Sequence, residues 1–141
     1  DLYIHRHDRL DNWDLVDRAA PNVVGQYLFD KSREPLYELA KSTDPWRRRT
    51  AIVATYWFIK NGETEDTFRI CDLLASDEHP MVQKAIGSWV RTAGDVDPSA
   101  MAAVLGRNIK ALPSTTMSMI IEKLPATEKQ HWRNAKKAAD G

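Results

Sequence analysis

The chain has 141 residues, which is long enough for one domain with a hydrophobic core of its own. Lysine and arginine together number 20, and so do aspartate and glutamate, so the net charge gives no argument for a nucleic-acid partner. No apolar run approaches the length of a membrane span, and no basic-then-apolar leader follows Asp1. A single cysteine, Cys71, excludes an internal disulfide and fits best as a small core residue of a protein in a reducing compartment.

Charge is sorted along the chain. Residues 45–60 carry four basic side chains and no acidic one, whereas residues 61–80 carry six acidic side chains against Arg69 alone. In stacked helices such sorting predicts one basic face and one acidic face, with an ordinary solvated surface as the alternative.

Apolar residues recur at helical spacing in six segments, which are 35–40, 46–59, 67–75, 81–92, 99–112 and 115–124. Four prolines fit the first position of a helix: Pro45, Pro80, Pro98 and Pro113. Asp44 and Asp97 stand where N-caps are expected.

Strand signals are nearly absent, so the sequence predicts an all-α protein. The helices are short and joined by brief polar turns, which favours a solenoid of helix pairs and leaves a compact helical bundle as the alternative. We expect a single domain over residues 1–141. Its last residues, 134–141, are expected to form a frayed, solvated tail.

Trp13 and Asp17 are four residues apart on an expected helix and therefore share a face. This face points away from the apolar side formed by Leu15, Val16 and Ala19. Three interpretations are open: the pair is exposed on the surface without a role, it contacts a neighbouring helix, or it forms half of a site for a cationic group.

Three consecutive arginines, Arg47, Arg48 and Arg49, follow Trp46 at the start of an expected helix. Arg49 falls on the stripe of Trp46, whereas Arg48 falls on the stripe of Ile52. A partly sheltered arginine usually binds a carboxylate or a phosphate, so both a structural ion pair and a phosphate site are open.

Four segments in register resemble the AlkD-type DNA alkylation-repair family: 12–17 with Ala20-Pro21, 46–53, 66–68 and 83–87. The resemblance runs from about Tyr3 to about Trp132. It implies a right-handed superhelical stack of antiparallel helix pairs, that is, a HEAT-like or ARM-type α-solenoid. It also implies a DNA glycosylase that removes cationic alkylated purines, such as 3-methyladenine and 7-methylguanine, from double-stranded DNA.

By resemblance, Asp17 is the catalytic residue, Trp13 and Arg49 bind the substrate, and Arg47, Arg48 and Lys84 are weaker DNA contacts. No metal, cofactor or membrane is implied. An ionised aspartate can stabilise positive charge on the sugar or orient a water, and a tryptophan face attracts a cation. The implied localisation is cytoplasmic, and nucleoid-associated in a bacterium.

The chain departs from the family pattern in two places. Ser88 follows Gly87 where the family has an aromatic residue, and the tryptophan is Trp89, which we expect to be a core residue. The chain also resembles only the C-terminal portion of the solenoid, so we expect an exposed apolar end and self-association. The sequence leaves open whether the chain is active without further repeats. The alternative function is a non-catalytic HEAT-like DNA- or protein-binding module, and a third hypothesis is a plain helical scaffold.

Overall fold

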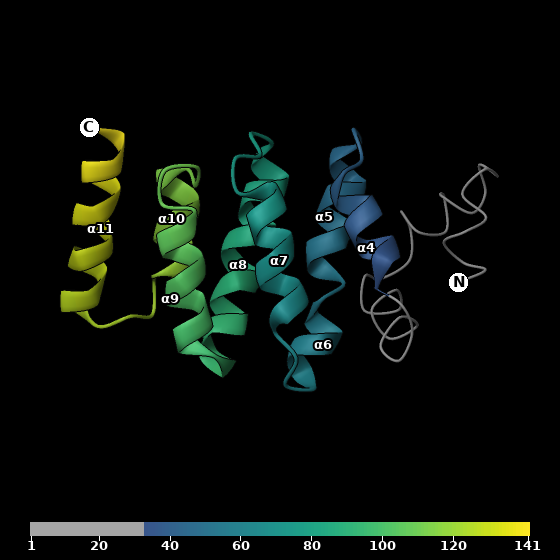
Figure 1. Ribbon diagram of the computed structural model, residues 1–141, viewed down its shortest axis with the longest axis horizontal. Helices are drawn as coiled ribbons and strands as arrows, with labels where there is room; N and C mark the ends of the chain where they lie inside the picture. The colour runs from purple at the N-terminus through teal and green to yellow at the C-terminus, as the bar shows by residue number, and fades with distance from the viewer. Residues whose placement is uncertain (1–32) are drawn as a thin grey trace.

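The computed structural model describes residues 33–141, and all regular secondary structure within them is α-helical (Figure 1). This confirms the all-α prediction for the described part of the chain. The helices are α4 (Glu34–Ala40), α5 (Pro45–Val53), α6 (Tyr56–Lys60), α7 (Glu65–Leu74), α8 (Pro80–Val96), α9 (Pro98–Arg107), α10 (Ser114–Ile120) and α11 (Ala126–Asp140). None of these helices is both long and apolar enough to cross a membrane.

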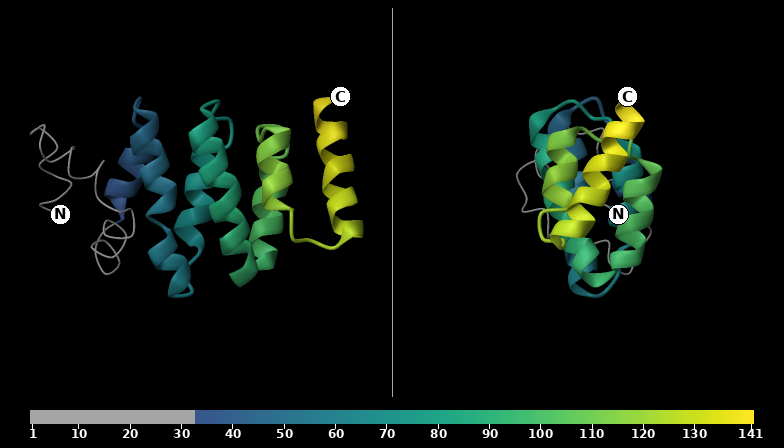
Figure 2. Two further views of the ribbon diagram at one scale, coloured as in Figure 1. Left: turned by 180° about the vertical axis from the view of Figure 1, so that it is seen from behind. Right: turned by 90° about the vertical axis from the view of Figure 1, so that its left-hand side faces the viewer.

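The helices follow one another in a row along the longest axis of the molecule, with α4 and α11 at opposite ends of the described part (Figures 1 and 2). Helix α8 holds the row together, because it packs against α5, α6, α7, α9 and α10. Its buried side chains include Val82, Ile86 and Val90, which recur every four residues and so form one stripe of the helix.

Most helices begin where the sequence predicts. Pro45, Pro80 and Pro98 occupy the first positions of α5, α8 and α9. The Asp44 carboxylate accepts a hydrogen bond from the Trp46 backbone N–H at 2.9 Å, and Asp97 caps α9 in the same way. The fourth proline differs, because Pro113 is the residue before α10 and Ser114 is the first helical residue.

The segment 46–59, expected as one helix, is divided into α5 and α6 at Ala54 and Thr55. The buried Thr55 hydroxyl donates a hydrogen bond to the Ile52 carbonyl oxygen at 2.6 Å and accepts one from the Thr67 hydroxyl at 2.7 Å. A side-chain donor that engages a helix carbonyl competes with the backbone ladder. The division therefore results from a tertiary contact with α7.

The core runs through the whole row of helices. Its largest fully buried side chains come from α4 to α10 and the turns between them: Leu36, Leu39, Ile52, Phe58, Ile70, Ile86, Leu105, Leu112, Ile120 and Ile121. Cys71 is also fully buried, which confirms its prediction as a core residue. Burial raises the pKa of its thiol to about 12, so Cys71 is not a thiolate at neutral pH.

Two glycines of α8 allow close approach of neighbouring helices. A Cβ added at Gly87 would lie 2.7 Å from the Cβ of Met119 in α10, and one added at Gly94 would lie 2.1 Å from the sulfur of Met101 in α9. Close packing against Met119 of α10 therefore requires glycine at position 87.

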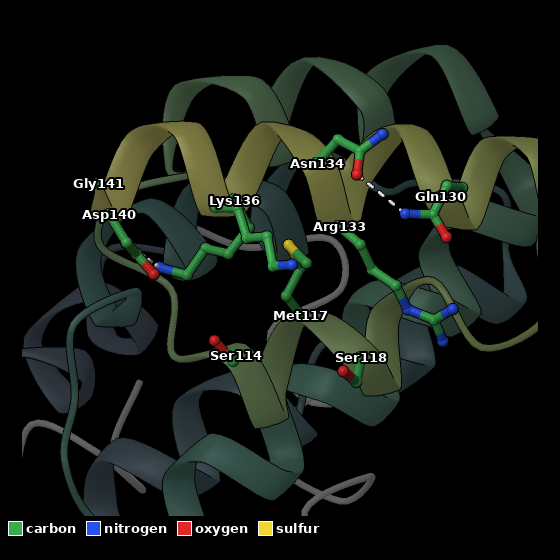
Figure 3. A pocket seen from close by; sticks show the side chains of 10 residues that line it. Ser114, Met117, Ser118, Gln130, Arg133, Asn134, Lys136, Asp140 and Gly141 are labelled. Carbon is green, nitrogen blue, oxygen red and sulfur yellow. Dashed lines mark hydrogen bonds and ion pairs between the residues drawn. The ribbon is translucent and has the colours of Figure 1, made fainter.

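Residues 134–140, for which a frayed tail is expected, belong to α11, which is helical through Asp140. Lys136 is buried, donates a hydrogen bond to the Lys110 carbonyl oxygen at 3.2 Å and forms an ion pair with Asp140 at 3.1 Å. Figure 3 shows Lys136 and Asp140 meeting along one side of α11, with Met117 of α10 nearby. The aliphatic stem of Lys136 and its hydrogen bonds thus fix a helix whose composition alone indicates a solvated tail.

Candidate functional site

The first turn of α5 brings an aromatic ring and a guanidinium together. Trp46 and Arg49 are three residues apart and so lie on one face of the helix, and the Arg49 Cζ atom is 5.6 Å from the centre of the Trp46 ring. Trp46 is 52% exposed, the highest value among the large hydrophobic residues of the described part of the chain. The hydrogen bond that the Trp46 backbone N–H donates to the Asp44 carboxylate fixes the backbone of this first turn, from which both side chains extend.

A pocket of about 350 Å³ lies between α5 and α8, beside this pair. Its lining residues are Trp46, Arg49, Met81, Lys84, Ala85, Ser88 and Trp89. The five residues from α8 recur at intervals of three and four, so they form a single stripe on the side of α8 that faces α5.

The pocket is positively charged. Within residues 33–141, Arg49 and Lys84 form no ion pair or hydrogen bond, and none of the pocket's lining residues from this part of the chain is acidic. Arg49 is half-buried and Lys84 is exposed. Two cations beside an exposed indole form a site that suits an anion next to a planar ring.

Trp89 forms one wall of this pocket and also packs against the hydrophobic core, so the expectation that it is a core residue holds only in part. Its ring meets Tyr56 edge to face, with the ring centres 6.1 Å apart. The Trp89 Nε1 atom is buried without a hydrogen-bond partner among the described residues.

Arg48 points to a different environment from Arg49. Its Nε atom donates to Asp77 at 2.6 Å, and its Nη1 atom donates to the Ser42 carbonyl oxygen at 3.1 Å. The Asp77 side chain is only 7% exposed. Of the two alternatives that the sequence leaves open, Arg48 therefore follows the structural ion pair, with a partner in the turn after α7. The Arg47 Nε atom lies 3.9 Å from the Oδ2 atom of Asp44, which is three residues earlier in the chain.

A family model described as DNA alkylation repair enzyme matches residues 1–124 of the chain. The chain belongs to this family. The match includes both walls of the pocket and ends before α11, which is thus a helix outside the matched region. A search of curated proteins and a search of solved structures each give no match.

The segment 66–68, one of the four that resemble the family, is structural in this fold. Asp66 accepts a hydrogen bond of 2.6 Å from Arg33 and another of 2.6 Å from the Tyr37 hydroxyl, so it ties α7 to α4. Burial, together with the hydrogen bond to the Asp66 carboxylate, raises the pKa of Tyr37. Thr67 bonds to Thr55 as described above, and Phe68 is buried.

Trp13 and Asp17 lie outside the described residues, so the structure does not test their predicted roles. Arg49 and Lys84 come together at one pocket, whereas Arg48 is held in an ion pair. Sequence reasoning did not single out Trp46, Met81 or Ser88 as site residues. The signal for the last two was their spacing with Lys84, which places all three on one stripe of a helix.

A second pocket, of about 630 Å³, lies between α10 and α11 (Figure 3). Arg133, Lys136 and Lys137 contribute positive charge to it, and Asp140 lines the same pocket. It contains no residue that the sequence predicts for the site. The pocket between α5 and α8 is therefore the candidate functional site.

Proposed function

We propose that the protein is a DNA glycosylase that hydrolyses the N-glycosidic bond of cationic alkylated purines, such as 3-methyladenine and 7-methylguanine, in double-stranded DNA. The observation that carries the proposal is the pocket in which Arg49 and Lys84 lie beside Trp46, with no acidic lining residue from the described part of the chain, in a protein of the DNA alkylation repair enzyme family. Its charge and its exposed ring fit a phosphate next to a base.

In the proposed reaction the bond between C1′ of the sugar and the purine nitrogen breaks, and its electron pair goes to the purine. The alkylated purine carries a positive charge before the step and leaves as a neutral molecule. Water then forms the new bond to C1′ and releases a proton to the solvent. The barrier lies in the positive charge that develops on the sugar, which an adjacent carboxylate stabilises.

Asp17 supplies this carboxylate in the proposal, and Trp13 offers its ring face to the cationic sugar or base, an interaction worth roughly 0.5–2 kcal/mol. Arg49 and Lys84 hold the phosphates that flank the lesion. In this arrangement Arg48 contributes through its ion pair with Asp77, which fixes α5, and Arg47 is a peripheral DNA contact. The reaction needs no metal or cofactor.

The row of helices from α4 to α11 supports the further proposal that the fold is a right-handed, HEAT-like superhelix in which successive helix pairs form a cradle for DNA. A cytoplasmic location, at the nucleoid in a bacterium, follows from a DNA substrate. Self-association of the chain is part of the same proposal.

The test is release of methylated purines from alkylated duplex DNA. Wild-type protein is compared with Asp17→Asn, which removes the charge of the catalytic candidate, and with Asp14→Asn, a matched change in the same segment. We expect release by wild type and Asp14→Asn, and a loss of at least about 100-fold for Asp17→Asn. Equal release by Asp17→Asn would contradict the role of Asp17, and DNA binding without any release would favour a non-catalytic binding module.

A further inference from the structure

Aromatic side chains continue beyond the pocket along α5 and α6. Tyr56 stands at the start of α6, is 41% exposed and meets Trp89 edge to face. Trp89 and Trp46 line the same pocket, so Trp46, Trp89 and Tyr56 follow one another from the pocket to the start of α6, and we call these three residues the aromatic strip. Trp57, partly buried, follows Tyr56 in α6.

Each end of the aromatic strip carries a cation. The Arg49 Cζ atom lies 5.6 Å from the centre of the Trp46 ring. At the other end, the Lys60 Nζ atom lies 5.7 Å from the centre of the Tyr56 ring and 5.2 Å from that of Trp57. Lys60 is exposed and forms no ion pair with a residue of the described part. The aromatic strip therefore carries a positive charge beside the exposed ring at each of its two ends.

This combination distinguishes the aromatic strip from other exposed apolar residues. Leu73 of α7 and Val96 of α8 have similar exposures, of 46% and 48%, but are aliphatic. An aliphatic side chain offers apolar area, whereas an aromatic ring offers a flat face on which another ring can stack. Rings flanked by cations match a strand of nucleic acid, in which bases alternate with phosphates.

We propose that the aromatic strip binds an unpaired segment of DNA, with bases stacked on Trp46 and Tyr56 and phosphates held by Arg49 and Lys60. Bases within a duplex already stack on one another, so only unpaired bases can use these ring faces. The inference rests on the proposed function in one respect, that DNA is the partner. It adds the strand state that this surface recognises and gives roles to Tyr56 and Lys60.

The experiment measures the affinity of the full chain for undamaged, fluorescently labelled oligothymidine of about 12 nucleotides and for a duplex of the same length, by fluorescence anisotropy. We expect wild type to bind the single strand more tightly. Tyr56→Ala should weaken single-strand binding by about tenfold and duplex binding by less than about threefold, because one stacked base is lost.

Three controls separate stacking from folding. Tyr56→Phe keeps the ring and should bind like wild type, and Leu73→Ala removes a similarly exposed side chain outside the aromatic strip and should also bind like wild type. If Tyr56→Ala melts at a lower temperature, the pair Trp46→Ala and Trp46→Phe repeats the comparison at the opposite end, where the side chain is 52% exposed.

Tighter binding to the duplex, or an equal loss on both DNA forms in the alanine variants, would overturn the inference. Base release from alkylated duplex DNA is measured separately on the same proteins. Single-strand binding without base release would contradict the proposed glycosylase and support the aromatic strip, whereas base release without single-strand preference would do the reverse.

Discussion

Two neighbouring arginines of α5, Arg48 and Arg49, meet different surroundings. Arg48 donates hydrogen bonds to Asp77 in the turn after α7 and to the Ser42 carbonyl oxygen in the turn before α5. Arg49, one residue later, lies over Trp46 at the pocket between α5 and α8 and forms no ion pair within residues 33–141. One step along a helix turns a side chain by about 100°, which here separates a structural cation from one that is open to a ligand.

The largest stability effect expected from this comparison is that of Arg48→Gln. It leaves the buried Asp77 carboxylate without its cation, so we expect a loss on the order of 3 kcal/mol in the free energy of unfolding. Arg49→Gln should change it by less than about 0.5 kcal/mol. Urea denaturation followed by circular dichroism measures both values, and equal losses in the two variants would break the comparison.

The two sides of α8, one toward α10 and one toward the pocket, can also be compared by substitution. Gly87→Ala, on the side toward α10, places a Cβ 2.7 Å from the Met119 Cβ, and we expect a loss of about 1–3 kcal/mol. Gly106→Ala in α9 is the matched control, because a Cβ there meets nothing within 4 Å, and it should stabilise the protein by up to about 1 kcal/mol. Thermal melting compares the variants, and an unchanged melting temperature for Gly87→Ala would show that Met119 moves aside.

The pocket side of α8 is tested by the salt dependence of DNA binding. Each phosphate contact contributes roughly −0.9 to the slope of log K against log salt concentration on duplex DNA. We expect the double variant Arg49→Gln/Lys84→Gln to reduce the magnitude of this slope by about 1.8, which corresponds to the loss of two phosphate contacts. Arg48→Gln should leave the slope unchanged, and a fall with Arg48→Gln would mean that its guanidinium reaches DNA.

The smallest predicted effect concerns the contact between α4 and α7. The pKa of Tyr37 is raised in the fold above its ordinary value of 10.0. The Tyr37–Asp66 hydrogen bond therefore contributes its full stability below pH 10.0 and loses it progressively at higher pH. Denaturation from pH 8 to about 11 should show a steeper alkaline loss for wild type than for Tyr37→Phe, and parallel curves would contradict this.

Local signals in the sequence were sufficient for most helix starts. Proline at the first position and an aspartate cap act within a few residues, and Asp44, Pro45 and Asp97 behave as predicted. The division at Thr55 and the ordered α11 depend on partners far along the chain. Thr67 is 12 residues from Thr55, and Lys110 is 26 residues from Lys136, so no local pattern contains them.

The site was predictable to a similar extent. Helical spacing placed Arg49 beside Trp46, which the structure confirms. It did not decide between an ion pair and a ligand site for Arg48, because the deciding carboxylate, Asp77, is 29 residues away. The position of Trp89 was also not predictable from local sequence. Its ring lies both against the core and at the pocket wall because of where α5 and α6 pack.

The most direct test of the account measures single-turnover release of methylated purine from alkylated duplex DNA by wild type, Arg48→Gln and Arg49→Gln. The temperature is chosen so that all three proteins are folded. We predict that Arg49→Gln releases purine at least about tenfold more slowly than wild type, the cost of one lost charged contact. Arg48→Gln should stay within about twofold. Wild-type release by Arg49→Gln, together with a loss in Arg48→Gln, would contradict the assignment of the two faces of α5.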